Sequence, residues 1–167
     1  MLAGWSLRRD IYARPMRQNP DHPWQGRWQL VAQTGFKEWL IHRGATPAEA
    51  ENEIQTLLHR STLRISSKKA GVRFVWSTDV PKRLFDTRRK VDYLLDGTTA
   101  TVVGSPVGET SAVATLEGAE LVHHVTGSSC RETHRRRVIG DRMFQEMTVD
   151  GSAKNAGTWC ELEWLRV

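Results

Sequence analysis

The chain has little cysteine and no long apolar run, and each shortage excludes a class of protein. Only two of its 167 residues are cysteines, Cys130 and Cys160, too few for the disulfide framework of a small secreted scaffold. No apolar stretch approaches the roughly 20 residues that a helix needs to span a bilayer. Polar residues interrupt the N-terminus before the apolar core of a secretory signal forms. We therefore expect one cytoplasmic domain, and we leave open organelle import by the short Arg-bearing N-terminus.

Catalytic and metal-binding patterns are also missing from the sequence. No Gly-rich phosphate loop leads from a strand into a helix, no Gly-x-Ser-x-Gly is present, and the acidic residues are dispersed. His123 and His124 are adjacent on a predicted strand, so they point to opposite faces and do not easily ligate one ion. We expect a protein that is not an enzyme and has neither metal nor cofactor, although a catalytic triad needs no sequence motif.

Residues 1–23 follow neither the strand period nor the helix period. Their prolines prevent a long helix, and their arginines are Arg8, Arg9, Arg14 and Arg17. Two interpretations are open for this basic and aromatic arm. It lies over the following domain with its aromatic side chains buried, or it docks on a partner protein, because Trp, Tyr and Arg dominate binding hot spots.

The stretch from Gly26 to Arg43 predicts a strand that runs directly into a short helix. The strand has an apolar side comprising Trp28, Leu30 and Ala32. After Thr34-Gly35 the period changes, and one helical face comprises Phe36, Trp39, Leu40 and Arg43. A period of two is typical of a half-buried strand, and a spacing of i, i+3, i+4, i+7 is typical of an amphipathic helix.

A second helix and nine further strands are predicted after Gly44. Thr46, Pro47 and Glu49 form the capping box and first turn of a helix that extends to about His59. Strand-like runs separated by turn residues follow at 62–68, 72–77, 83–95, 98–103, 111–116, 120–125, 131–139, 143–149 and 158–165. Regularly spaced strands of this kind indicate a β-sandwich or a closed up-and-down barrel.

Two stretches together carry a family pattern. The first comprises Gly26, Trp28, Leu30, Gly35, Phe36, Leu40 and Ile41, with departures at Lys37 and Trp39. The second is the hairpin at 111–125, in which Thr-Leu-Glu-Gly ends one strand and Leu-Val-His begins the next. Both resemble the intracellular lipid-binding proteins, the fatty-acid-binding-protein-like branch of the calycin superfamily. Over residues 24–167 the resemblance implies a ten-stranded antiparallel up-and-down β-barrel, with a two-helix lid between its first and second strands.

The resemblance also implies a site inside the barrel. In the family, a late strand supplies an inward Arg for the ligand carboxylate. Arg136 matches it, and Arg135 or Arg137 takes its place if the register slips by one residue. The family's Arg-x-Tyr pair on the last strand is replaced here by Leu162 and Trp164, so the second guanidinium and the phenol are missing. The expected ligand contacts are Phe36, Leu40, Phe74, Trp76, Arg136, Leu162 and Trp164.

Three functions follow from this sequence. The first is non-catalytic binding and transport of a hydrophobic ligand, a fatty acid or related lipid, inside the barrel. The second is an assembly subunit that uses the barrel as a scaffold and the arm for protein–protein interaction. Nucleic-acid binding through the arginine clusters of a chain with net charge +5 is the weakest of the three. An open cavity containing Arg136 would support the first function, and a barrel filled by Trp28, Trp76 and Trp164 would support the second.

Overall fold

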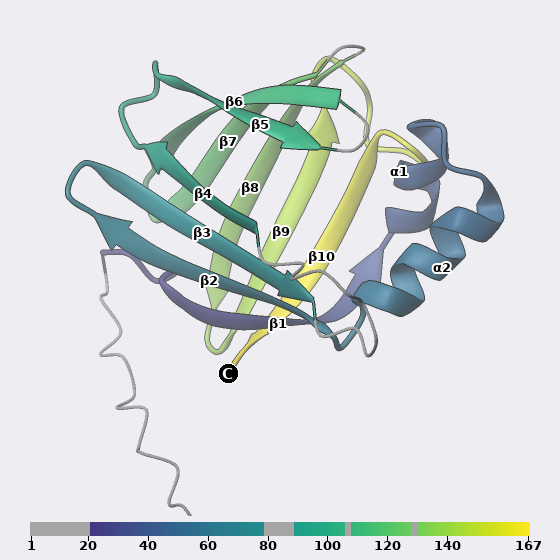
Figure 1. The fold of residues 1–167 in the computed structure, drawn as a ribbon, viewed down its shortest axis with the longest axis horizontal. Helices are drawn as coiled ribbons and strands as arrows, with labels where there is room; N and C mark the ends of the chain where they lie inside the picture. Colours follow the sequence, from purple (N-terminus) through teal and green to yellow (C-terminus); the bar gives the residue numbers. More distant parts are fainter. Residues whose placement is uncertain (1–20, 79–88, 106–107, 128–129) are drawn as a thin grey trace, which may run out of the picture.

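Ten antiparallel strands and two helices form a nearly closed barrel, as the sequence predicts (Figure 1). The computed structural model describes residues 21–78, 89–105, 108–127 and 130–167. The predicted arm up to residue 20 and the first part of the predicted 83–95 strand lie outside these residues. Neither helix of the described part is long and apolar enough to cross a membrane.

The helices and strands follow the predicted order. The elements are β1 Gly26–Thr34, α1 Phe36–His42, α2 Pro47–Leu57, β2 Ser61–Lys68, β3 Gly71–Thr78, β4 Arg89–Leu94, β5 Ala100–Ser105, β6 Gly108–Glu117, β7 Glu120–Thr126, β8 Arg131–Ile139, β9 Arg142–Val149 and β10 Trp159–Arg166. Both helices lie between β1 and β2, at one end of the barrel (Figure 1).

The sheet order is β4-β3-β2-β1-β10-β9-β8-β7-β6-β5, so β1 joins the first strands to the last. Except for β4 and β5, successive strands are antiparallel neighbours, as in an up-and-down barrel. Within the described residues no backbone pairing joins the edge strands β4 and β5. A side-chain contact crosses that gap, because the Thr101 hydroxyl lies 3.3 Å from the Asp92 carbonyl oxygen and donates to it.

The corner between β1 and α1 departs from a simple alternation. Trp28 and Leu30 are buried as predicted, but a β-bulge between Leu30 and Ala32 shifts the register. A bulge bends a strand locally and re-aims the residues that follow. Gly35 then begins α1 with φ 71°, and a Cβ there would lie 2.9 Å from the Trp159 carbonyl oxygen. The close approach of β10 therefore requires glycine at this position.

The predicted capping box of α2 is present. The Thr46 hydroxyl accepts a hydrogen bond from the Glu49 backbone N–H at 3.2 Å, and the Glu49 carboxylate accepts one from the Thr46 N–H at 2.8 Å. Pro47 occupies the first turn, where its missing N–H costs nothing. These contacts fix the start of the second lid helix independently of the barrel.

Two tryptophans are buried near the start of β1, which lies at the end of the barrel away from the helices, hereafter the closed end (Figure 1). Trp24 and Trp28 are fully buried, and the Trp28 indole N–H donates to the Trp24 carbonyl oxygen at 2.9 Å. The Arg166 guanidinium lies over the Trp28 ring at 4.1 Å and donates to the backbone oxygens of Pro23 and Gln25, at 2.7 Å each. The segment before β1 is thus fastened to the last strand.

Replacing Trp24 by Ala should lower the free energy of unfolding by about 3–5 kcal/mol, because it leaves a large cavity at the closed end. Urea denaturation measures this change. Deleting residues 1–20 provides the control and should preserve the wild-type midpoint, since Trp24 and its contacts stay in place. A truncated protein that does not fold would show that the arm contributes side chains to the core.

Candidate functional site

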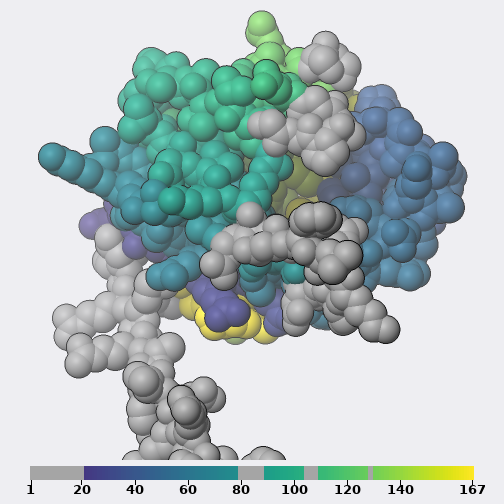
Figure 2. Space-filling model, in the orientation of Figure 1, coloured from purple at the N-terminus to yellow at the C-terminus, as the bar shows by residue number. Residues whose placement is uncertain are grey.

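The barrel encloses an open cavity of about 440 Å³, a size typical of small-ligand sites. Its apolar walls include Leu30 of β1, Leu57 of α2, Trp76 of β3 and Leu162 of β10. In Figure 2, atoms with the colour of the last strands are visible between the teal strands and the blue helices. The cavity is therefore formed jointly by the barrel and the second lid helix.

Arg136 brings a cation into this cavity. Its side chain is 3% exposed, whereas its neighbours on β8 lie on the outer face. Arg135 pairs there with Glu117 at 2.6 Å, and Arg137 pairs with Glu161 at 3.2 Å. Because side chains alternate along a strand, Arg136 faces inward while the two adjacent guanidinium groups find carboxylates outside.

The contacts of Arg136 are with rings rather than with an acid. Its Nη1 lies 3.0 Å from His123 Nδ1, and the guanidinium carbon is 4.8 Å from the centre of the Phe74 ring. In the described part of the chain no carboxylate pairs with it. Burial lowers the pKa of Arg136 to about 10, and the nearby Tyr93 opposes that shift. The guanidinium therefore stays charged at neutral pH.

His123 is neutral beside this cation. Burial lowers the pKa of His123 well below 6.5, and the charge of Arg136 lowers it further. A guanidinium can only donate, so His123 Nδ1 is the acceptor and its ring proton is on Nε2. That Nε2 is buried and has no hydrogen-bond partner among the described residues. The imidazole thus presents a free N–H donor.

Several cavity side chains share this lack of a partner. Besides His123 Nε2, the buried polar atoms without a hydrogen bond include Arg136 Nε, Trp164 Nε1 and Gln145 Oε1, and all four residues line the cavity. Buried polar groups in proteins are nearly always hydrogen-bonded. Three of these four atoms are N–H donors, so the cavity can donate hydrogen bonds to a ligand group that has oxygen acceptors.

Known structures share this architecture, although no family model and no curated protein sequence matches the chain. The REP1-NXSQ fatty acid transporter superposes with a TM-score of 0.68 at 14% identity, over 86% of this chain and 96% of that chain. The chain has the fatty-acid-binding-protein-like calycin fold. Fatty-acid-binding protein 1 of Echinococcus granulosus superposes with a TM-score of 0.66 at 15% identity, over 86% and 96% of the two chains.

Lipid binding protein 8 of Caenorhabditis elegans is similar to the same extent. Its TM-score is 0.66 at 16% identity, and the superposition covers 86% of this chain and 95% of that chain. At such low identity the comparison shows the fold alone.

The structure brings together four of the seven predicted contact residues. Trp76, Arg136, Leu162 and Trp164 line the cavity. Phe74 is fully buried and packs against the Arg136 guanidinium, so it supports that cation and does not border the cavity. The two residues from α1, Phe36 and Leu40, do not border it either. The lid contact comes from Leu57 of α2 instead, whereas the buried residue of α1, Trp39, packs edge-on against the His134 ring of β8.

The polar cavity residues that the sequence does not predict as ligand contacts include Tyr93, His123, His134 and Gln145. Gln145 carries a usable signal, because it interrupts the inward apolar face of β9 between Met143 and Met147. The strand register then places it beside Arg136 on one side and Leu162 on the other. The exposed His124 bonds Thr133 on the outer face, and no metal-binding group of three side chains occurs within the described residues.

A partly exposed ion pair connects the lid to the barrel close to the cavity. Arg43, at the end of α1, donates to the Glu132 carboxylate of β8 and stacks on Trp39, 3.3 Å from the ring centre. Glu132 also accepts a hydrogen bond from His134 Nε2 at 2.9 Å, and His134 borders the cavity. This group of four side chains is the lid latch.

The latch fixes the charge of Glu132. Burial raises the pKa of Glu132, but the hydrogen bonds from His134 and Arg43 outweigh burial and lower it from 4.5 to about 2. Burial lowers the pKa of His134 more than its bond to Glu132 raises it, so the imidazole is neutral at pH 7. A lowered carboxyl pKa stabilises the fold above pH 4.5, and this contribution is lost as the pH falls toward 2.

Replacing Glu132 by Gln should lower the free energy of unfolding at pH 7 by about 2–3 kcal/mol, as the loss of this pKa shift requires. The difference from wild type should shrink below pH 4.5 and disappear near pH 2. Urea denaturation between pH 2 and pH 7 measures it. Glu51→Gln is the control and should change the stability little, because the Lys37–Glu51 pair is exposed to solvent. A difference that is constant with pH would contradict the role of the latch.

Proposed function

We propose that the barrel binds a hydrophobic ligand with an acidic head group, such as a fatty acid or related lipid, and that it does so without catalysis. The observation that carries this proposal is the charged Arg136 side chain, 3% exposed and without a carboxylate partner in the described part of the chain. A ligand carboxylate would supply the missing anion, and the apolar walls would hold the chain attached to it.

Electrostatics supports an anionic head group. Burying a charge is costly unless it is paired and hydrogen-bonded, and the contact with the Phe74 ring offsets only part of that cost. A carboxylate accepts two parallel N–H bonds from a guanidinium, the strongest hydrogen-bond geometry available to Arg. The free N–H groups of His123 and Trp164 are additional donors for the same oxygens.

The tryptophans leave room for the ligand. Trp28 is part of the closed end, with its indole bonded to Trp24, whereas Trp76 and Trp164 are walls of an open cavity. A barrel used only as a scaffold would need no such space. The fatty acid transporter and fatty-acid-binding protein 1 of Echinococcus granulosus, which share the fold, lend further support to a carrier role in transport.

The replaced last-strand pair determines how the head group would be held. Leu162 contributes no charge and Trp164 only an indole N–H, so a single guanidinium would face the carboxylate. Gln145 lies between Arg136 and Leu162 in the register and would be the nearest neutral partner. We propose the cytoplasm as the compartment, supported by the low cysteine content of the chain. Docking through the arm stays a prediction, because residues 1–20 lie outside the described part.

Replacing Arg136 by Leu should weaken binding of a fatty acid about ten- to a hundredfold, since a hydrogen bond to a charged group contributes roughly 1.5–3 kcal/mol. Binding of the methyl ester of the same acid should change much less, because it lacks the charge. Displacement of a fluorescent fatty acid by each compound measures both affinities.

The matched control is Arg135→Leu, which removes a cation from the outer face of the same strand and should leave both affinities unchanged. Circular dichroism verifies that each variant is folded. Equal losses for the acid and the ester in the Arg136 variant would show that the guanidinium does not contact the head group. No fatty-acid binding by the wild type would contradict the carrier function itself.

A further inference from the structure

A second hollow, of about 560 Å³, lies on the outer face of strands β1–β4. Five cationic side chains border it: Arg27, Arg64, Lys68, Arg73 and Lys90. They occupy outward positions of the strands, since the intervening residues Leu63 and Ile65 of β2 are fully buried in the barrel. This hollow, hereafter the basic hollow, is separate from Arg136 and its surroundings.

The strand register places like charges side by side in the basic hollow. Arg27 of β1 is directly opposite Arg64 of β2. Arg64 is opposite Val75 of β3, and Val75 is opposite Lys90 of β4. Like charges in opposite positions destabilise a sheet. The row of cations therefore imposes a cost that a bound anion would remove.

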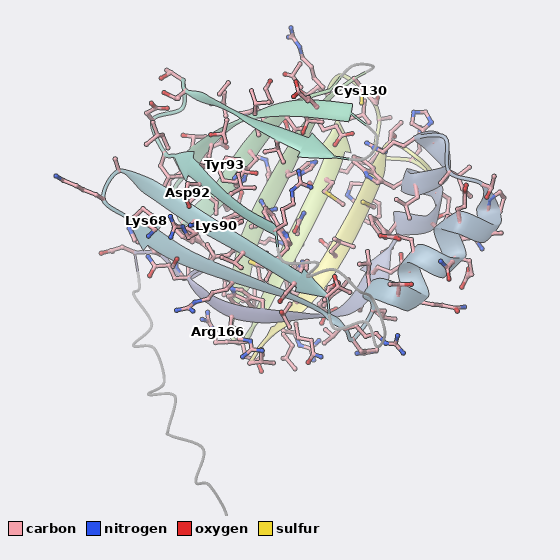
Figure 3. All side chains as sticks on the ribbon, in the orientation of Figure 1. Lys68, Lys90, Asp92, Tyr93, Cys130 and Arg166 are labelled. Carbon is pink, nitrogen blue, oxygen red and sulfur yellow. The ribbon has the colours of Figure 1, made fainter. Side chains whose placement is uncertain are left out.

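In the described part of the chain, Asp92 is the one carboxylate that forms an ion pair with any of the five cations. Asp92 binds Arg73 through two hydrogen bonds of 2.5 Å. The bond from Arg73 is the largest cause of the lowered pKa of Asp92, and burial opposes it, while Lys90 and Lys68 lower it further through their charge. Figure 3 labels Lys68, Lys90 and Asp92 close together on strands β2 and β4.

The remaining cations of the basic hollow are uncompensated. Within the described residues neither Arg27 nor Arg64 has an ion pair, and Lys68 and Lys90 have none either.

The outer face of the late strands is arranged differently. Four of its cations are matched with carboxylates, in the pairs Arg135–Glu117, Arg137–Glu161, Arg142–Glu163 and Lys154–Glu146. The chain as a whole carries a net charge of +5. Among the described residues, the basic hollow thus gathers more positive charge than its paired carboxylate, Asp92, compensates.

The geometry points to a binding site for a small polyanion with two or more phosphate groups, free in solution or as the head group of a lipid. Adjacent strands are about 4.8 Å apart, so the cations from β1 to β4 span about 14 Å, wider than a single phosphate. Ser66 and Ser77 at the same face add hydroxyl donors. Guanidinium groups bind phosphate through two parallel hydrogen bonds.

The composition of the basic hollow disfavours a nucleic-acid strand. Single-stranded nucleic acids are held by aromatic side chains on which the bases stack, and the described residues that line the hollow include none. Its volume also falls in the range of small-ligand sites. Thr62 and Ser77, bonded to each other at 2.6 Å, line both the basic hollow and the cavity, so a bound polyanion would lie next to the cavity wall that they form.

The test compares wild type with the double variant R64Q/K90Q. Isothermal titration calorimetry with inositol 1,4,5-trisphosphate should show binding by the wild type and a loss of about tenfold or more in the variant. The matched control R137Q/R142Q removes the same charge from the opposite face and should retain the wild-type affinity. Equal losses in the two variants would overturn the site, because they would reflect net charge alone. Wild-type binding of inorganic phosphate as tight as that of the trisphosphate would overturn the requirement for several phosphate groups.

A second arm distinguishes the two sources of the ligand. Vesicles of phosphatidylcholine with phosphatidylinositol 4,5-bisphosphate are compared with vesicles of equal charge made with phosphatidylserine, by co-sedimentation. Preference for the bisphosphate vesicles, lost in R64Q/K90Q, assigns a lipid head group; binding of the soluble trisphosphate alone assigns a free ligand. No binding in either arm, or binding of duplex DNA in their place, overturns the proposal. Arg136→Leu should leave these results unchanged, so the basic hollow is tested separately from the cavity.

Discussion

Burial of the Arg136 guanidinium is the constraint on which the arrangement of the cavity depends. Its neighbours are the ring of Phe74, the neutral imidazole of His123 and, within the described residues, no carboxylate. The rings of Phe74, Tyr93 and His123 pack at 4.5–5.5 Å from one another. Residues of β3, β4, β7 and β8 are thereby held together around one charge, although they are far apart in the sequence.

The cationic side chains of this protein occur in two kinds of environment. Cations that connect distant parts of the fold donate hydrogen bonds to carboxylate or carbonyl oxygens. Arg43 donates to Glu132 in the lid latch, and Arg166 donates to backbone oxygens at the closed end. In the cavity and in the basic hollow, Arg136 and Arg64 have no such partner in the described part of the chain. Because an uncompensated charge is costly when buried or crowded, these are the places at which an anionic ligand contributes most.

Much of the fold follows from local patterns in the sequence. Alternation predicts the strands, and Thr46 with Glu49 predicts the start of α2, because the physics of each lies within a few residues. The bulge after Leu30 is not predicted. It depends on how β1 meets β10, a strand more than a hundred residues away. The role of Arg166 is not predicted for the same reason: it contacts Trp28 and the backbone before β1, which are far from it in the sequence.

The candidate site also has features that the sequence determines and features that only the tertiary structure decides. The sequence alone determines that Arg136 faces opposite to Arg135, because strand periodicity is a local property. Only the tertiary structure decides what surrounds it: pairing of β7, β8 and β9 places Leu121 and Gln145 on either side of Arg136 and His123 opposite His134. Cross-strand register and barrel closure set these neighbours, and both depend on contacts between segments distant in the chain. Whether a polar side chain faces water or a cavity is therefore settled by the closed sheet.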